Sequence, residues 1–113
     1  MKKKKIKEVI LEEEKRSAKD SAYRLLGIRA RSEKEIHDKL KQKGYDENII
    51  KEAIETLKSY NYINDSDFAG LVATDKVKNK KVGEKLLRQE LFKKGIPEKT
   101  INETIKKIYN END

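Results

Sequence analysis

Several residue types are missing or scarce in this chain, and each absence removes a class of function. The 113 residues contain no cysteine and a single histidine, His37. Without cysteine the chain can form no disulfide, thiolate metal site or cysteine nucleophile. One histidine leaves no nucleophile–base pair and no histidine-rich metal site, and the glycine-rich loop of nucleotide-binding proteins is absent. We therefore expect a protein without catalytic activity, metal or cofactor.

Long apolar runs and strand-like alternation are also absent. Only 35% of the residues are hydrophobic whereas 43% are charged, and no stretch approaches the roughly 18 apolar residues of a membrane-spanning helix. Glu8 and Glu12–Glu14 follow the Lys2–Lys5 run where a signal peptide would be apolar, so we interpret those lysines as a disordered, non-specific tail. We expect a cytoplasmic protein with a thin core and no contact with a membrane.

Part of the sequence occurs twice. Residues 39–47 (KLKQKGYDE) reappear 51 positions later as residues 90–98 (ELFKKGIPE). The flanking apolar residues also correspond: Ile36, Ile50, Ile54 and Leu57 match Leu87, Ile101, Ile105 and Ile108. Repetition at this period is typical of stacked copies of one small supersecondary unit.

Capping residues and apolar spacing predict three helices in the first copy. The first is amphipathic over residues 6–26, either as one long helix or as a frayed segment joined to a firmer helix ending near Arg29. Residues 32–35 (SEKE) match the capping box that starts a helix, and Gly44 suits the left-handed residue that follows its end. A third helix begins near Asp46.

The second copy predicts three more helices. Asn64 or Asp65 can cap the fourth helix, and Pro97 suits the first turn of the sixth. We expect the connection between the fourth and fifth helices to be about five residues longer than its counterpart, through a loop at 79–81. Apolar residues mark the faces of the fourth and fifth helices: Phe68, Leu71, Val72, Val82, Leu86, Leu87 and Leu91.

The predicted fold is therefore all-α. It has an N-terminal helical extension (1–16) followed by two tandem three-helix repeats packed side by side (17–63 and 64–113). Each repeat alone would be marginally stable, because so small a unit buries little apolar surface.

Most of the net charge of +7 lies in one window. Residues 76–94 contain eight basic and two acidic side chains. Such a window favours binding to a polyanion or to an acidic protein surface, although a solvated lysine-rich face is the simpler interpretation. Two groups of basic residues are binding candidates: Arg24, Arg29 and Arg31, and Lys78, Lys80, Lys81, Lys85 and Arg88. The exposed amides of a helix that starts at Gly83 would add to an anion site in the second group.

Four aromatic residues cluster near the expected joint between the repeats. These are Tyr45, Tyr60, Tyr62 and Phe68. Aromatic side chains can stack on unpaired bases, but packing between the repeats, with the tyrosine hydroxyls reaching water, is the interpretation we favour.

The order and spacing of several motifs resemble the RecX family, regulators of the RecA recombinase. The first copy carries AYRLL (22–26), RARSEKEI (29–36), KL (39–40) and KGY (43–45). The connector YIND (62–65) with Phe68-Ala69 is similar to the aromatic–aliphatic–acidic linker of that family. Gly83, LRQEL (87–91) and KGI (94–96) resemble its second repeat. The resemblance runs from about residue 18 to about residue 109.

The resemblance implies a non-enzymatic monomer that binds the RecA filament and, non-specifically, the backbone of its single-stranded DNA. RecX proteins generally inhibit the ATPase, strand exchange and co-protease activities of the filament. They usually carry three repeats, so this chain is a short or truncated form with two. Two alternatives stay open: a stand-alone, non-specific nucleic-acid-binding module, since basic three-helix units also resemble helix-turn-helix domains, and a helical adaptor whose basic face is only solvated.

Overall fold

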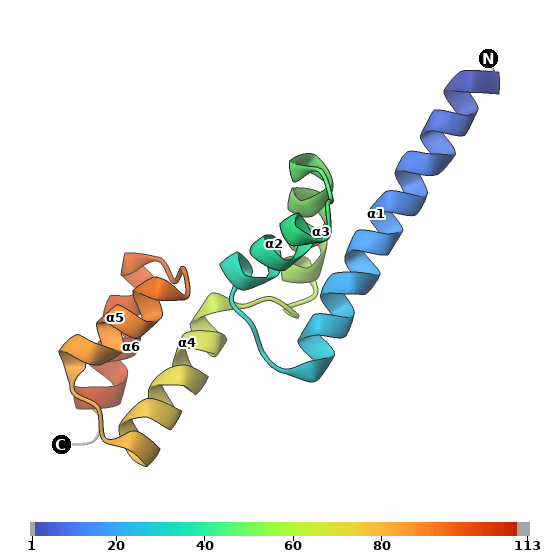
Figure 1. Ribbon diagram of the computed structural model, residues 1–113. Coiled ribbons are helices and arrows are strands. Elements are labelled where there is room, and N and C mark those ends of the chain that lie inside the picture. The colour runs from blue at the N-terminus through green and yellow to red at the C-terminus, as the bar shows by residue number, and fades with distance from the viewer. Residues whose placement is uncertain (1, 111–113) are drawn as a thin grey trace. The chain divides into compact units, whose positions relative to one another are not determined.

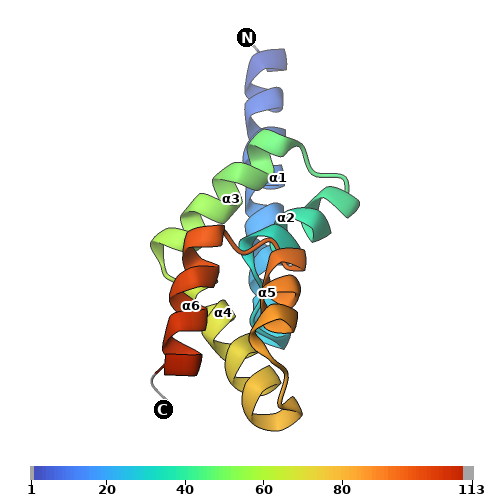
Figure 2. The same cartoon turned by 90° about the vertical axis from the view of Figure 1, so that its left-hand side faces the viewer.

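The computed structural model describes residues 2–110, and every regular element in that part of the chain is helical (Figures 1 and 2). This confirms the predicted all-α fold. The elements are α1 (Lys2–Ile28), α2 (Glu33–Gln42), α3 (Glu47–Ser59), α4 (Asp65–Thr74), the π-helical turn η1 (Asp75–Asn79), α5 (Glu84–Lys93) and α6 (Glu98–Asn110). They form two compact units: residues up to Ala30 with Ile36–Ile63, and Arg31–Glu35 with the residues from Asn64 onward.

The first unit is built on the packing of α1 against α3. Ala18 and Ala22 of α1 are fully buried, and such small side chains let the two helices approach closely. The other buried apolar residues of this core are Ile36, Leu40, Ile49, Ile50, Ala53, Ile54, Leu57 and Ile63. The hydroxyl of Tyr45 lies 2.5 Å from that of Ser17, which ties the α2–α3 turn to α1.

Helix α1 is one continuous helix, and Lys2–Lys5 belong to its backbone rather than to a disordered tail. Figure 1 shows that its N-terminal half extends beyond α2 and α3. Its apolar side chains there, Ile6, Val9 and Ile10, are accordingly 59%, 57% and 50% exposed. The core of the first unit therefore depends on the second half of α1.

The second unit packs α6 against both α4 and α5. Its buried apolar residues are Phe68, Ala69, Ala73, Leu87, Leu91, Ile96, Ile101 and Ile105. The hydroxyl of Tyr109 donates a hydrogen bond of 2.9 Å to the carbonyl of Val82 and so fixes the connector before α5. Leu71 and Leu86, which we expected on the buried faces, are 60% and 48% exposed.

Local capping chemistry sets most helix ends as the sequence predicts. The Ser32 amide donates to the Glu35 carboxylate at 3.0 Å and the Glu35 amide donates to Ser32 Oγ at 3.1 Å, which is the capping box. Asp46 and Asn64 accept from the first-turn amides of α3 and α4. Gly44 and Gly95 follow the ends of α2 and α5 with φ values of +95° and +81°, which glycine adopts without steric cost.

The two copies are related by a constant shift of 51 positions. Residues 33–42 match 84–93, residues 47–59 match 98–110, and the ends of α1 and η1, residues 28 and 79, also correspond. The connections 29–32 and 80–83 are equally long, so the expected extension of the second connection is wrong. The copies differ in winding instead, because the turn before the connection is α-helical in the first and π-helical in the second.

Candidate functional site

Four exposed lysines lie along the chain from η1 to the first turn of α5, and we call them the connector lysines: Lys78, Lys80, Lys81 and Lys85. Lys78 belongs to η1, Lys80 and Lys81 to the connection, and Lys85 to the first turn of α5. Among residues 2–110 none of these ammonium groups has a hydrogen-bond or ion-pair partner. Their charge is therefore available to an external anion.

The backbone around the connector lysines is unusual. The five-residue π-helical turn η1 contains Lys78 and precedes the other three, and Asn79 Nδ2 donates to the Asp75 carboxylate at 3.0 Å within it. Lys81 then adopts a φ of +53°, which is uncommon for a residue with a Cβ. π-helical turns and left-handed non-glycine residues are both enriched at functional sites. Both features occur at the lysine-rich connection.

Arg88, the fifth candidate of this group, is engaged within the unit. Its Nη1 donates to Asn102 Oδ1 at 2.7 Å, and its Nη2 lies 3.6 Å from the Glu84 carboxylate. Gly83 is the N-cap of α5 and supplies no side-chain cap, so the first-turn amides point outward. The carboxylate of Glu84 in that turn competes with any anion bound there.

The three arginine candidates differ in their accessibility. Arg24 and Arg29, at the end of α1, are exposed, and the Arg29 guanidinium donates to the carbonyl of Ala30 at 2.9 Å. Arg31 is buried, with only 9% of its surface accessible. Arg24 and Arg29 are therefore accessible from solvent, whereas Arg31 is not. Arg29 and Lys80 occupy equivalent positions of the two copies, so both connections begin with a cation.

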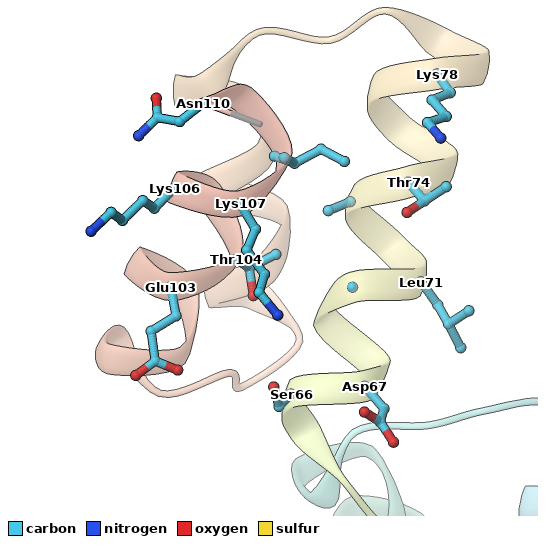
Figure 3. Close-up of a pocket in the computed structure, with 13 residues that line it drawn as sticks. Ser66, Asp67, Leu71, Thr74, Lys78, Glu103, Thr104, Lys106, Lys107 and Asn110 are labelled. Carbon is cyan, nitrogen blue, oxygen red and sulfur yellow. The ribbon is translucent and has the colours of Figure 1, made fainter. Parts of the chain in front are cut away.

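A groove of about 1140 Å³ between α4 and α6 is lined by Lys78 and by two further cations (Figure 3). Lys106 and Lys107 of α6 line it together with small residues of α4, including Gly70 and Ala73. Figure 3 places Lys78 at one end of the groove and Asp67 at the other. The sequence analysis missed Lys106 and Lys107 because they lie outside the basic window. They line the groove only because α6 packs beside α4.

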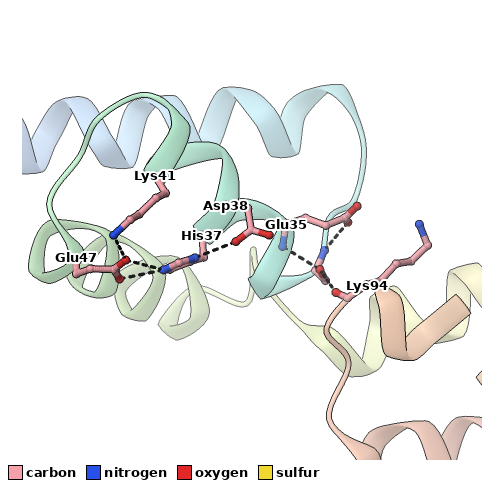
Figure 4. Close-up of polar contacts among 7 residues, drawn as sticks. Glu35, His37, Asp38, Lys41, Glu47 and Lys94 are labelled. Atoms are coloured by element: carbon pink, nitrogen blue, oxygen red, sulfur yellow. Dashed lines mark hydrogen bonds and ion pairs between the residues drawn. The ribbon is translucent and has the colours of Figure 1, made fainter. Parts of the chain in front are cut away.

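A polar cluster joins α2 to the start of α3 in the first unit (Figure 4). His37 Nε2 lies 2.9 Å from the Glu47 carboxylate and its Nδ1 lies 3.1 Å from that of Asp38. Hydrogen bonds to Glu47 and then to Asp38 raise the pKa of His37 above its ordinary 6.5. The same cluster lowers the pKa of Glu47, through Lys41 first and His37 second. It stabilises the α2–α3 turn and holds no catalytic arrangement.

Two of the four aromatic residues expected to pack in the core lie on the surface. Phe68 is buried and Tyr45 is partly buried, but Tyr60 and Tyr62 are 66% and 51% exposed. Tyr62 instead contacts Tyr60 and Tyr23. Neither Tyr60 nor Tyr62 belongs to the core of the first unit, because Ile63 fills the core position at this turn.

The described residues offer neither a metal site nor a membrane-spanning helix. Between Lys2 and Asn110 no group of three or more histidine, cysteine, aspartate or glutamate side chains is arranged to hold a metal ion. Within the same range, none of the helices combines the length and apolarity that crossing a membrane would require.

Comparison with known proteins gives consistent matches. The family models for the first and second three-helix domains of RecX match residues 18–57 and 64–105. Proteins named regulatory protein RecX from Clostridium perfringens (strain SM101 / Type A) and Clostridioides difficile (strain 630) are 35% and 40% identical over 108 and 91 residues. These alignments cover 96% and 80% of this chain but 50% and 42% of the relatives, so the chain spans about half their length.

A crystal structure of regulatory protein RecX has the same fold. It superposes with a TM-score of 0.89 over 98% of this chain and 55% of the other, at 22% sequence identity.

Proposed function

Because this chain belongs to the RecX family, we propose that it is a non-enzymatic regulator that binds the RecA–single-stranded DNA filament and inhibits its ATPase, strand-exchange and co-protease activities. The relatives it matches are named as regulatory proteins, which supports a role without catalysis. We further propose that the acting form is a cytoplasmic monomer, with residues 17–63 and 64–113 as the two repeats and residues 1–16 as an extension.

The observation that carries the proposal is the free charge of the connector lysines. Four exposed ammonium groups without partners among the described residues lie within eight positions of one another. A lysine that neutralises a phosphate releases a condensed counterion, so binding should weaken steeply with salt. Acidic protein surface would be attracted in the same way. Arg24 and Arg29 offer planar guanidinium groups suited to carboxylate or phosphate.

The test is the single-strand-dependent ATPase of RecA titrated with this chain. Inhibition at less than one chain per RecA protomer supports the proposal, since a filament regulator need not occupy every subunit. Replacing all four connector lysines by alanine should shift the inhibition curve to higher concentration. A matched variant that removes the same charge elsewhere, at the exposed Lys39, Lys43, Lys51 and Lys99, should inhibit like the wild-type chain. Equal inhibition by both variants would contradict the assignment of the site.

A stand-alone, non-specific nucleic-acid-binding module is the second candidate, and the same free lysines favour it. Sequence-specific reading has little support, because the Arg88 guanidinium is already bonded to Asn102 and lies near Glu84. Binding to a labelled oligonucleotide without RecA, over a series of salt concentrations, separates the candidates. Tight DNA binding with no effect on the RecA ATPase would establish the module and overturn the regulator.

A further inference from the structure

We propose that Tyr23, Tyr60 and Tyr62 form a stacking surface for unpaired bases of single-stranded nucleic acid. The proposal rests on the function proposed above and deepens it by assigning a base-contacting site to the first unit. We call these three residues the tyrosine surface.

The ring of Tyr62 contacts those of Tyr23 and Tyr60 on the outside of the first unit. The ring centroids of Tyr23 and Tyr62 are 5.4 Å apart with the planes at 82°, and those of Tyr60 and Tyr62 are 5.9 Å apart at 40°. The three residues are 56%, 66% and 51% exposed. Each ring is therefore held by a neighbouring ring while about half of the residue still faces solvent.

The backbone of the turn that follows α3 leaves both Tyr60 and Tyr62 on the surface. Asn61, between them, has a φ of +62°, which is uncommon outside glycine and best tolerated by asparagine. The amides of Asn61 and Tyr62 donate to the carbonyls of Lys58 and Leu57 at 2.9 Å each, which closes the end of α3. Ile63 then enters the core with only 3% exposure. The turn is anchored by Ile63, so the two tyrosines are not needed to hold it.

The ring geometry suits a single strand rather than a duplex. Bases stacked in a duplex rise by about 3.4 Å per strand and are parallel, whereas these centroids are separated by more than 5 Å and the rings are inclined. Only bases that are unstacked and free to turn can each meet a different ring face. Stacking on such rings tolerates any base, because every base presents a π-face.

Charge on the same elements favours a nucleic acid over an apolar protein partner. Lys19 lies one helical turn before Tyr23, Arg24 follows it directly, and Lys58 precedes Tyr60 by two positions. Lys58 and Arg24 are exposed. Surfaces that bind single strands usually combine aromatic rings, which stack on the bases, with nearby cations, which contact the phosphates.

The tyrosine surface has no counterpart in the second copy at the one position that can be compared. Tyr23 corresponds to Thr74 at the shift of 51 positions, and the residues matching 60–62 lie outside the described range. Tyr45, the other tyrosine of the first unit, bonds Ser17 through its hydroxyl. The tyrosine surface is therefore a property of the first copy and not of the repeated scaffold.

Binding of labelled oligo(dT) of about 20 nucleotides, measured by fluorescence anisotropy in several salt concentrations, tests the proposal. Tyr60→Ala and Tyr62→Ala should each weaken binding about tenfold. Tyr60→Phe and Tyr62→Phe, which keep the rings, should bind like the wild type. Phe92→Ala is the matched control, since Phe92 is an aromatic residue of the second unit that is 76% exposed, and it should change nothing.

The salt dependence and a duplex competitor complete the test. The tyrosine variants should weaken binding equally at every salt concentration, because stacking releases no counterion, whereas alanine at the connector lysines should flatten the salt slope. A duplex of the same length should show no effect of the tyrosine variants. Wild-type affinity of the alanine variants for oligo(dT), or no binding of oligo(dT) by the wild-type chain, would overturn the proposal.

The RecA ATPase assay keeps this inference separate from the proposed function. Loss of inhibition by the tyrosine variants without loss of oligo(dT) binding would make the rings a protein contact and overturn the stacking site. If the wild-type chain binds oligo(dT), the tyrosine variants weaken that binding as expected, and the chain does not inhibit RecA, the proposed regulator is overturned and the stacking site remains.

Discussion

Ser32 Oγ donates a hydrogen bond of 2.6 Å to the carbonyl oxygen of Lys94, 62 positions further along the chain. The Ser32 hydroxyl oxygen also accepts from the Glu35 amide at 3.1 Å, so one hydroxyl caps α2 and satisfies the carbonyl at the end of α5. Ser32 is fully buried, and water cannot replace either bond without a rearrangement.

Ser32→Ala should lower the free energy of unfolding by about 2 kcal/mol, because it removes an N-cap and leaves a part-buried carbonyl without its donor. Urea unfolding followed by circular dichroism measures the loss. Ser59→Ala is the control, since the Ser59 hydroxyl also donates to a backbone carbonyl, that of Thr56, but in an exposed position. Equal losses in the two variants would contradict the role given to Ser32.

Gly95→Ala should destabilise the chain more than Gly44→Ala. Both glycines have positive φ, so alanine costs about 1 kcal/mol at either position. A methyl group at Gly44 meets open space, whereas at Gly95 it would overlap the side chain of Lys34 from its Cβ outward. Lys34 cannot swing away from an overlap at its own Cβ. Urea titrations of the two variants compare their free energies of unfolding. Equal losses would show that Lys34 moves aside at little cost.

The stabilising effect of His37 should disappear as the pH rises. Its pKa is raised in the folded chain, so its contribution is fully present below the ordinary value of 6.5 and is lost as the pH rises through the folded value. Glu47, whose pKa is lowered in the folded chain, contributes stability that is present above its ordinary pKa of 4.5 and is lost as the pH falls through the lowered value. Unfolding of the wild type and of His37→Gln should therefore differ at about pH 6 and converge by about pH 8.5.

The pH effect should be small, because the side chain of His37 is 37% exposed and solvent screens its charge. Glu47→Gln provides the control, since it removes the first cause of the raised pKa. In that background the stability difference between His37 and His37→Gln should depend less on pH, because only Asp38 still raises the pKa of His37. A difference that grows toward high pH would have the wrong sign for this cluster.

Adjacent leucines of α5 should respond very differently to truncation. Leu87 is fully buried, and Leu87→Ala should cost about 2 to 5 kcal/mol through lost burial and a residual cavity. Leu86 is 48% exposed, and Leu86→Ala should cost less than about 1 kcal/mol. The midpoints of thermal or urea unfolding compare them directly. Comparable losses would mean that Leu86 is covered in solution.

The helix ends could be predicted from the sequence because capping acts over a few residues. Ser32 with Glu35, Asp46 and Asn64 bond the amides nearest to them, and Gly44 and Gly95 take a backbone conformation that other residues avoid. The repeat was also visible, since its buried positions recur at one fixed shift.

The exposure of individual apolar residues could not be predicted in the same way. Leu86 precedes the buried Leu87 and Leu71 lies one helical turn after the buried Phe68, yet each helix of a three-helix unit is covered only where its neighbours touch it. Helical spacing shows that a helix has an apolar face, but it does not show how much of that face the neighbouring helices bury. The winding of η1 was missed for a similar reason, because no residue type marks a π-helical turn.

The basic window predicted the connector lysines, but the rest of the candidate surfaces needed three-dimensional contacts. Lys107 joins Lys78 at one groove from 29 positions away, and Tyr23 meets Tyr62 from 39 positions away. Neither pair shares a local pattern. Arg31 shows the opposite limit, since an arginine in a basic sequence context can still be buried.

The two halves of α1 should differ in how well their amide protons are protected from exchange. Its second half shares the core through Ala18 and Ala22, whereas Ile6, Val9 and Ile10 lie mostly in solvent. A helical segment of about 12 residues without tertiary packing is only marginally stable in water, so the first half should open without disturbing the second. Hydrogen–deuterium exchange should be fast before about Lys15 and slow over residues 18–26, dividing one continuous helix into two segments of unequal protection.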